Sequence, residues 1–271
     1  MHIGNRNFDV NNKTYIAGIL NVTDDSFSDG GKYNKLESAL FRCQEMIDEG
    51  ADIIDIGGES TRPGYTPVSA SEEMERVLHV LERIKSEFDI PVSLDTRKPK
   101  VANEGLKAGA DIINNVEGLG TDYEMADVIA QSGAVAIISH PGKGNYKNVV
   151  TEVVNEIEDL IKRALKADID RERIIIDPGI GFGKDTRENL ELIKNIDSIK
   201  ALDVPIMLGV SRKSFIGNVL NLSVDERLEG TLAISAYACM KGIPFVRVHD
   251  VKANKRVIQM LEAIDECNKL F

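Results

Sequence analysis

The stretch Arg173-Ile174-Ile175-Ile176-Asp177 decides the fold, because it is an unbroken apolar run that ends in a residue able to do chemistry. Strands that are buried on both faces read as near-continuous runs of Val, Ile and Leu, which is typical of a parallel sheet. Eight such runs occur along the chain. They are residues 14–20 before Asn21, 52–57 before Glu59, 91–94 before Asp95, 110–113 before Asn114, 134–138 before His140, 173–176 before Asp177, 204–208 before Ser211 and 245–248 before His249.

Segments with helical periodicity separate these runs. We expect one helix around residues 36–47 and another around 74–84, and further helices near 98–108, 122–132, 148–166, 186–197, 224–241 and 251–268. Eight strand–helix units in roughly 250 residues are the size of one (β/α)8 barrel, whose active site lies at the C-terminal ends of the strands. The sequence therefore predicts an α/β fold, a TIM barrel, formed by residues 1–271 as a single domain.

The composition restricts the class of partner. The formal net charge of −11 argues against a nucleic acid or an anionic membrane, although an anionic small molecule remains possible where basic residues converge. The three cysteines show no metal spacing, so we expect free thiols in a reducing cytoplasm. The first residues lack an apolar signal region, and the apolar runs are too short to span a membrane.

Polar groups at three strand ends suggest a ligand. Asp95 and Asp177 supply carboxylates, which only accept hydrogen bonds, and Asn114 supplies an amide, which donates and accepts. Such a trio suits the edge of a flat heterocycle with several N–H groups and a ring carbonyl. Each residue alone could instead be a helix cap or a turn residue.

The glycine-rich stretch 177–184 resembles a phosphate-binding loop but lacks the required spacing, and Asp185 follows Lys184 where Ser or Thr is needed. We interpret its glycines as allowing the backbone to approach a planar ligand, with Phe182 as an apolar wall. A purely structural turn is the alternative. Lys213 follows the seventh run beside an expected helix start, where a ring carbonyl or a carboxylate is a natural partner.

Arg247 and His249 are two residues apart, so they point the same way if both belong to the strand. Together with Arg62 they would form a cationic cluster suited to phosphates, whereas a surface salt bridge is the alternative for Arg247. His140 and His249 do not make a zinc site, because no third His or Cys completes it. Asn21 with Asp25 suits magnesium shared with substrate phosphate oxygens.

At these residues the chain closely resembles the dihydropteroate synthases of folate biosynthesis. The resemblance extends over nearly the whole chain, in order, and its motifs are jointly specific. The matching stretches are residues 18–23, 25–31, 57–64, 93–96, 112–114, 177–184, 209–214 and 247–250.

The resemblance implies that 4-aminobenzoate displaces diphosphate from (7,8-dihydropterin-6-yl)methyl diphosphate to give dihydropteroate. It also implies Mg2+ as the cofactor, a homodimer and catalytic roles for Lys213, Arg247 and Asp95. Three sets of residues follow from it: Asp95, Asn114, Asp177 and Lys213 for the pterin; Asn21, Arg62, Arg247 and His249 for diphosphate and magnesium; and Phe27, Thr61, Arg62, Pro63, Phe182, Lys213 and Ser214 for aminobenzoate. We expect the pterin and diphosphate sets to be separable, with Arg247→Ala sparing a pterin that lacks phosphates.

The chain departs from the family pattern at Asp24, Asn115, Glu188, residues 139–142 and residues 252–253. The departures leave the expected fold and reaction intact but concern the shape of the pterin wall. An alternative of a different class is a pterin-binding module that passes a methyl group from methyl-tetrahydrofolate to a corrinoid protein. Such a module would not need Arg62, Pro63 or Lys213, which favour the synthase.

Overall fold

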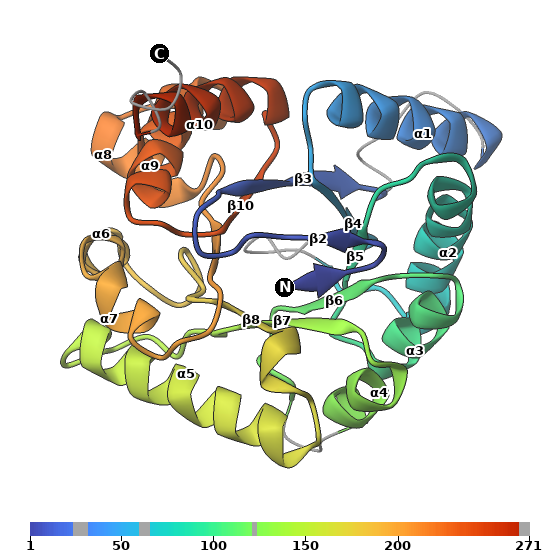
Figure 1. Ribbon diagram of the computed structural model, residues 1–271, viewed down its shortest axis with the longest axis horizontal. Helices are drawn as coiled ribbons and strands as arrows, with labels where there is room; N and C mark the ends of the chain where they lie inside the picture. The colour runs from blue at the N-terminus through green and yellow to red at the C-terminus, as the bar shows by residue number, and fades with distance from the viewer. Residues whose placement is uncertain (24–31, 60–65, 121–123, 266–271) are drawn as a thin grey trace.

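The computed structural model describes residues 1–23, 32–59, 66–120 and 124–265, without the side chains of residues 32–35. Eight parallel strands form one sheet in the order β8-β7-β6-β5-β4-β3-β10-β9, and helices surround it (Figure 1). The prediction of a (β/α)8 barrel with eight parallel strands is confirmed. The strands are β3 (Tyr15–Asn21), β4 (Ile53–Gly57), β5 (Val92–Asp95), β6 (Ile112–Asn115), β7 (Val135–Ser139), β8 (Ile174–Asp177), β9 (Met207–Gly209) and β10 (Phe245–Val248).

The barrel closes between β8 and β9 through a single parallel bridge, Ile176 to Ile206. The backbone N–H of Ile176 donates to the carbonyl of Pro205 at 2.9 Å. Proline cannot donate a ladder hydrogen bond in return, which explains why pairing at this seam is sparse and β9 is short.

The helices follow the predicted segments, with two corrections. They are α1 (Lys32–Asp48), α2 (Ala70–Glu87), α3 (Pro99–Lys107), α4 (Glu124–Ser132), α5 (Val149–Lys166), α6 (Thr186–Lys194), α7 (Ile196–Lys200), α8 (Ser214–Leu220), α9 (Leu228–Met240) and α10 (Val251–Asp265). The expected helix 186–197 breaks at Asn195, whose side-chain amide bonds the carbonyl of Glu191 at 2.8 Å. The expected helix 224–241 is a 3-10 turn, η3 (Val224–Glu226), followed by α9.

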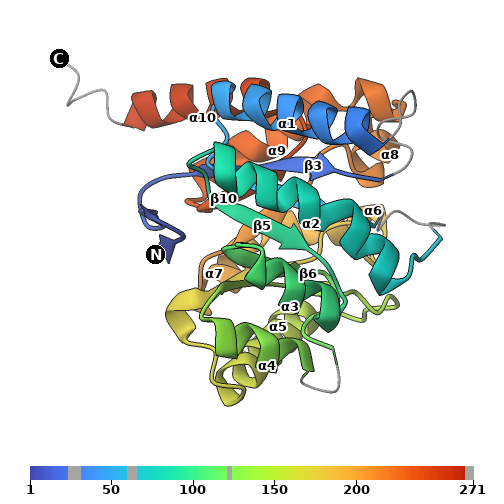
Figure 2. The ribbon, with the colours of Figure 1, turned by 90° about the vertical axis from the view of Figure 1, so that its right-hand side faces the viewer.

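Neighbouring helices pack on one another around the sheet, as α1 does on α2, α2 on α3 and α3 on α4 (Figure 2). The core lies between this ring and the strands, with Cys43, Met46, Leu81 and Ile84 fully buried. No helix among the described residues is both long and apolar enough to cross a membrane.

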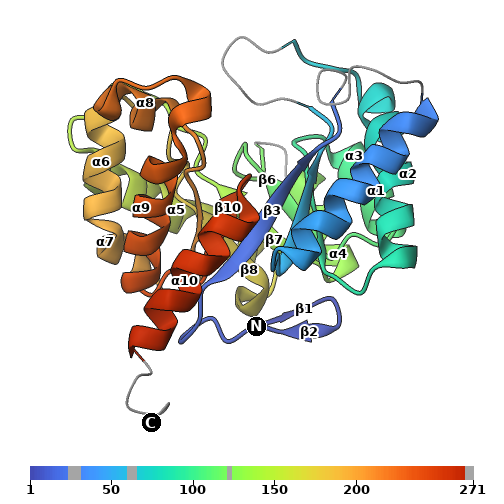
Figure 3. The same ribbon diagram turned by 90° about the horizontal axis from the view of Figure 1, so that it is seen from above.

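An N-terminal hairpin, β1 (His2–Ile3) and β2 (Arg6–Asn7), was not expected from the sequence. It lies at the end of the barrel where the strands begin (Figure 3). Ile3 and Phe8 join a second apolar cluster with inward residues of the strands, among them Ile53 and Phe245. The hairpin therefore covers the N-terminal end of the barrel, which leaves the C-terminal strand ends for a site.

Candidate active site

Four neighbouring strands present residues at or next to their C-terminal ends at one level. In the sheet register Asn21 of β3 pairs with Gly57 of β4, Gly57 with Asp95 of β5, and Asp95 with Asn114 of β6. A Cβ on Gly57 would lie 3.6 Å from Oδ1 of Asn21 and 3.9 Å from Cβ of Asp95, so both side chains border this glycine. The fold thus brings together Asn21, Asp95 and Asn114, as the sequence predicts.

Arg247 of β10 reaches into the barrel and joins two carboxylates. Its Nε donates to Oδ2 of Asp55 at 2.5 Å, and its Nη2 donates to Oδ2 of Asp95 at 2.7 Å. The alternative of a surface salt bridge is therefore wrong. The contact with Asp95 argues against a strict separation of the two sets at this residue, because Arg247 holds a carboxylate of the pterin set.

Asp55 was missed by the sequence reading. Its side chain is buried in β4, and the side-chain amide of Asn114 donates to its Oδ1 at 3.3 Å. A signal was present, since a carboxylate inside an apolar run of a doubly buried strand needs a partner within the barrel. With Asp55 included, the cluster holds Asp55, Asp95, Asn114 and Arg247 in direct contact.

Asp177 and Lys213 form a second part of the site. Oδ1 of Asp177 accepts the backbone N–H of Gly179 at 2.7 Å. A Cβ on Gly209 would lie 3.2 Å from Oδ2 of Asp177 and 4.0 Å from Nζ of Lys213, so both groups border the same glycine. Lys213 also donates to the carbonyl of Ile180, and its Nζ lies 4.5 Å from the centroid of the Phe182 ring.

Burial shifts the ionisation of these groups. It raises the pKa of Asp95 to about 7, although Arg247 opposes the shift, and it raises the pKa of Asp177 against the opposing charge of Lys213. Burial lowers the pKa of Lys213 to about 8, with Asp177 opposing. Burial alone would lower the pKa of Arg247, but Asp55 and Asp95 raise it overall, so Arg247 stays charged.

One acceptor in this cluster has no protein partner. Oδ1 of Asn114 is buried, and it accepts no hydrogen bond within the described part of the chain. A buried acceptor without a donor costs about 1–3 kcal/mol, so a ligand N–H group at this point would gain from satisfying it.

The glycine-rich stretch 177–184 packs on the preceding strand–helix loop. Gly179 has φ +68°, and a Cβ there would lie 1.9 Å from the carbonyl oxygen of His140. Nζ of Lys184 lies 2.9 Å from the carbonyl oxygen of Gly179, 3.0 Å from that of Phe182 and 3.2 Å from Nδ1 of His140. The glycines thus bring two loops together and Lys184 fastens them, which shapes the wall that carries Phe182.

Arg247 and His249, at the end of β10, make different contacts. β10 ends at Val248, so the condition for Arg247 and His249 to point the same way is not met. Nδ1 of His249 lies 3.0 Å from Oγ of Ser211, while Arg247 turns into the carboxylate cluster. Ser214 is exposed and begins α8, beside Lys213.

The donors available for a metal are hard oxygens. No group of three or more His, Cys, Asp or Glu residues that could hold a metal ion occurs in the described ranges. Asn21 places its amide oxygen beside Gly57 and next to the carboxylate level of Asp95. Such a donor suits a magnesium ion that takes most of its ligands from substrate phosphate and water.

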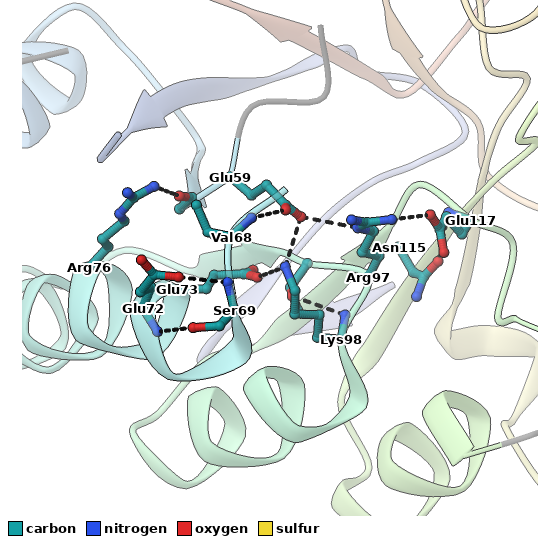
Figure 4. A network of polar contacts seen from close by, with 12 residues as sticks. Glu59, Val68, Ser69, Glu72, Glu73, Arg76, Arg97, Lys98, Asn115 and Glu117 are labelled. Atoms are coloured by element: carbon teal, nitrogen blue, oxygen red, sulfur yellow. Dashed lines mark hydrogen bonds and ion pairs between the residues drawn. The ribbon is translucent and has the colours of Figure 1, made fainter. Parts of the chain in front are cut away.

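Charged residues beside the site join β4 to β5 (Figure 4). Glu59 accepts from the backbone N–H of Val68 at 2.8 Å, from Nε of Arg97 at 3.0 Å and from Nζ of Lys98 at 2.8 Å. Lys98 also donates to Oε2 of the fully buried Glu73 at 2.5 Å. Arg97 lies two residues after Asp95, so this network holds the loop that follows β5 beside the site.

Four predicted substrate residues, Phe27, Thr61, Arg62 and Pro63, and also Asp24 and Asp25, lie outside the described residues.

Comparison with known proteins agrees with this geometry. Residues 17–249 match the family model described as pterin binding enzyme. The chain is 49% identical to a dihydropteroate synthase of Clostridium beijerinckii over 97% of this chain and 99% of that protein. A crystal structure of a dihydropteroate synthase from Clostridium difficile in the presence of pteroic acid superposes with a TM-score of 0.92 at 46% identity, covering 95% of this chain and 99% of that one. A Xanthomonas albilineans dihydropteroate synthase with 4-aminobenzoic acid gives a TM-score of 0.89 at 39% identity, covering 93% of each chain.

Proposed function

Because the chain belongs to the dihydropteroate synthase family of pterin-binding enzymes, we propose that the strand-end cluster described above carries the reaction of that family. The enzyme is a transferase that joins (7,8-dihydropterin-6-yl)methyl diphosphate to 4-aminobenzoate and releases diphosphate. The observation that carries our assignment of residues is the buried, unpartnered acceptor of Asn114 beside the carboxylates of Asp55 and Asp95.

The pterin lies against this cluster in our proposal. Asp95, Asn114 and Asp177 accept hydrogen bonds from the N–H groups of the heterocycle, and Lys213 donates to an acceptor on the ring. The contacts of Arg247 keep Asp95 oriented, so Arg247 serves the pterin as well as the diphosphate. Asp55 orients the amide of Asn114 by accepting from its Nδ2, which leaves Oδ1 for the ligand.

The reaction needs no nucleophile from the enzyme. As the C–O bond to diphosphate breaks, the electron-rich pterin stabilises the cation-like methylene, and the amine nitrogen of 4-aminobenzoate forms the new C–N bond and then loses a proton. Arg247, His249 and Arg62 stabilise the leaving diphosphate. We place Mg2+ at Asn21 together with the diphosphate oxygens, where it would neutralise negative charge when bound.

The resemblance to the family supports a binding site for 4-aminobenzoate formed by Phe27, Thr61, Arg62, Pro63, Phe182, Lys213 and Ser214. Phe182 and Lys213 already lie against each other in the described part of the site. Their contact supports a flat apolar wall with a cation at its edge, which suits an aromatic ring.

A homodimer of one-domain subunits in the cytoplasm is also part of the proposal. α9 buries Thr231, Ser235 and Ala238, and Glu229 is the single charged residue in its sequence. A helix of this kind is typical of a buried position. Met240 of α9 and Met260 and Ile264 of the adjacent α10 are exposed, so a second copy is the occupant that we propose for this face. The buried thiol of Cys43 accords with a reducing compartment.

Asp177→Asn tests the pterin assignment. The substitution keeps the shape but turns an acceptor pair into a mixed donor and acceptor that faces N–H groups, so we expect a pterin without phosphates to bind about 1–3 kcal/mol more weakly by titration calorimetry. The same substitution at the exposed Asp197, which pairs with Lys241, serves as the control and should leave binding unchanged. Unaltered binding to Asp177→Asn would show that this carboxylate does not contact the pterin.

The pH dependence of kcat/KM for pterin diphosphate should be bell-shaped. Below a pH of about 7 Asp95 gains a proton and can no longer act as a pure acceptor, and above about 8 Lys213 loses its positive charge. The rate constant should therefore rise through the first value and fall through the second. Lys213→Ala should remove the alkaline fall, and a wild-type profile that is flat through this range would contradict the assignment.

A further inference from the structure

Ser211 and His249 form a hydrogen-bonded pair on the loops after β9 and β10. The hydroxyl Oγ of Ser211 accepts the backbone N–H of His249 at 3.2 Å and lies 3.0 Å from Nδ1 of the imidazole. Ser211 is 7% exposed, so its hydroxyl group depends on protein partners. The carbonyl of His249 accepts from Nη2 of Arg42 in α1 at 3.1 Å, which holds the backbone of the histidine from its other side.

The hydrogen bonds of this hydroxyl define where its proton points. One lone pair of Oγ is used by the backbone N–H of His249. Among the described residues, Nδ1 of His249 is the only acceptor placed against the hydroxyl proton. A buried hydroxyl that donates to nothing is costly, so the proton lies on the line to Nδ1. Nδ1 must then be unprotonated, and Nε2 carries the hydrogen of the neutral ring.

We propose that Ser211 is a positioning residue that holds His249 as the Nε2–H tautomer, so that the ring donates a hydrogen bond to the leaving diphosphate. The inference rests on the proposed role of His249 toward diphosphate. Diphosphate oxygens only accept, so an Nε2 lone pair would repel them while Nε2–H stabilises them. The donor matters here because Arg247 already directs Nε and Nη2 to Asp55 and Asp95.

The tautomer can be read directly by nuclear magnetic resonance. The chain contains four histidines, so the full-length enzyme labelled with 15N in its histidine rings should give resolvable signals, and the loss of one set in His249→Gln assigns His249. The wild type should show protonated Nε2 and bare Nδ1 for His249 in mildly alkaline buffer. Ser211→Ala should give a mixture of both tautomers, and Ser211→Thr, which keeps the hydroxyl, should restore the single form.

The value of kcat should depend on which tautomer His249 adopts. Ser211→Ala should lower kcat about twofold, since the rings that carry their hydrogen on Nδ1 would present a lone pair to the diphosphate, and Ser211→Thr should recover most of the loss. The affinity for a pterin without phosphates should stay the same in both variants, and Ser86→Ala on the exposed face of α2 should match the wild type.

Protonated Nδ1 in the wild type, or a single unchanged tautomer in Ser211→Ala, would overturn the inference. A normal kcat in His249→Gln would instead overturn the role of His249 toward diphosphate, on which the inference rests. The spectra would then describe the tautomer of a residue that does not act in catalysis. If Ser211→Ala does not fold, Ser211→Thr still tests the inference, because His249 in this variant must show the same tautomer as in the wild type.

Discussion

Lys213→Ala should lower turnover at least ~100-fold, because the ammonium is expected to stabilise charge in a site shielded from water. Its Nζ lies beside Asp177 and over the ring of Phe182, where both the pterin and aminobenzoate are proposed to bind. The midpoint of thermal unfolding should stay within a few degrees of the wild type. Asp177 already has a raised pKa and can take up a proton once its cationic neighbour is gone.

The control is Lys162→Ala, which removes a lysine that pairs with Glu158 and Asp159 on the exposed face of α5. Its turnover and unfolding should match those of the wild type. A collapse of stability in Lys213→Ala, with turnover per folded molecule preserved, would mean that Lys213 is a structural ion-pair partner.

Lys98→Met should destabilise the fold by about 3–5 kcal/mol, the typical cost of removing one partner from a buried ion pair. Lys98 donates to Glu59 at 2.8 Å and to Glu73 at 2.5 Å, and the side chains of these glutamates are 6% and 0% exposed. Oε1 of Glu73 has no hydrogen-bond partner within the described residues, so loss of Lys98 leaves this carboxylate uncompensated. Denaturant titration of the wild type and the variant measures the change.

Two further variants make the test specific. Lys107→Met removes an exposed lysine from the end of α3, the helix that follows Lys98; there it pairs with the exposed Glu104, and its loss should leave the stability almost unchanged. Lys98→Met combined with Glu73→Gln removes the orphaned charge and should recover part of the loss. Equal stability of Lys98→Met and Lys107→Met would contradict a structural role for the buried pair.

The strands could be predicted from the sequence because all of them are buried on both faces, so apolar runs and strand ends coincide. The N-terminal hairpin could not, since each of its strands has only two residues and its stability comes from Ile3 and Phe8 packing on the barrel. The interruption of the expected helix 186–197 at Asn195 could not be predicted from the sequence either. Its side-chain bond to the backbone competes with helix continuation, a local choice that periodicity does not report.

For the proposed site, the positions of several residues at the strand ends could be predicted from the sequence, but their contacts could not. Asp95 and Asp177 end their strands and Asn114 is the last residue but one of β6, so register alone brings Asp95 beside Asn114. The pairing of Arg247 with Asp55 joins residues that are 192 positions apart, and no local pattern shows it. Two departures from the family pattern have local explanations. Glu188 completes a capping box with Asp185 at the start of α6, and Asn115 accepts the backbone N–H of Glu117 at 2.8 Å.

Release of diphosphate tests the account most directly. The wild-type chain, mixed with (7,8-dihydropterin-6-yl)methyl diphosphate, magnesium and 4-aminobenzoate, should release diphosphate and form an equal amount of dihydropteroate. Omission of 4-aminobenzoate should abolish the formation of dihydropteroate and slow the release of diphosphate strongly. Diphosphate release at the same rate without 4-aminobenzoate, or no dihydropteroate in the complete mixture, would contradict the account.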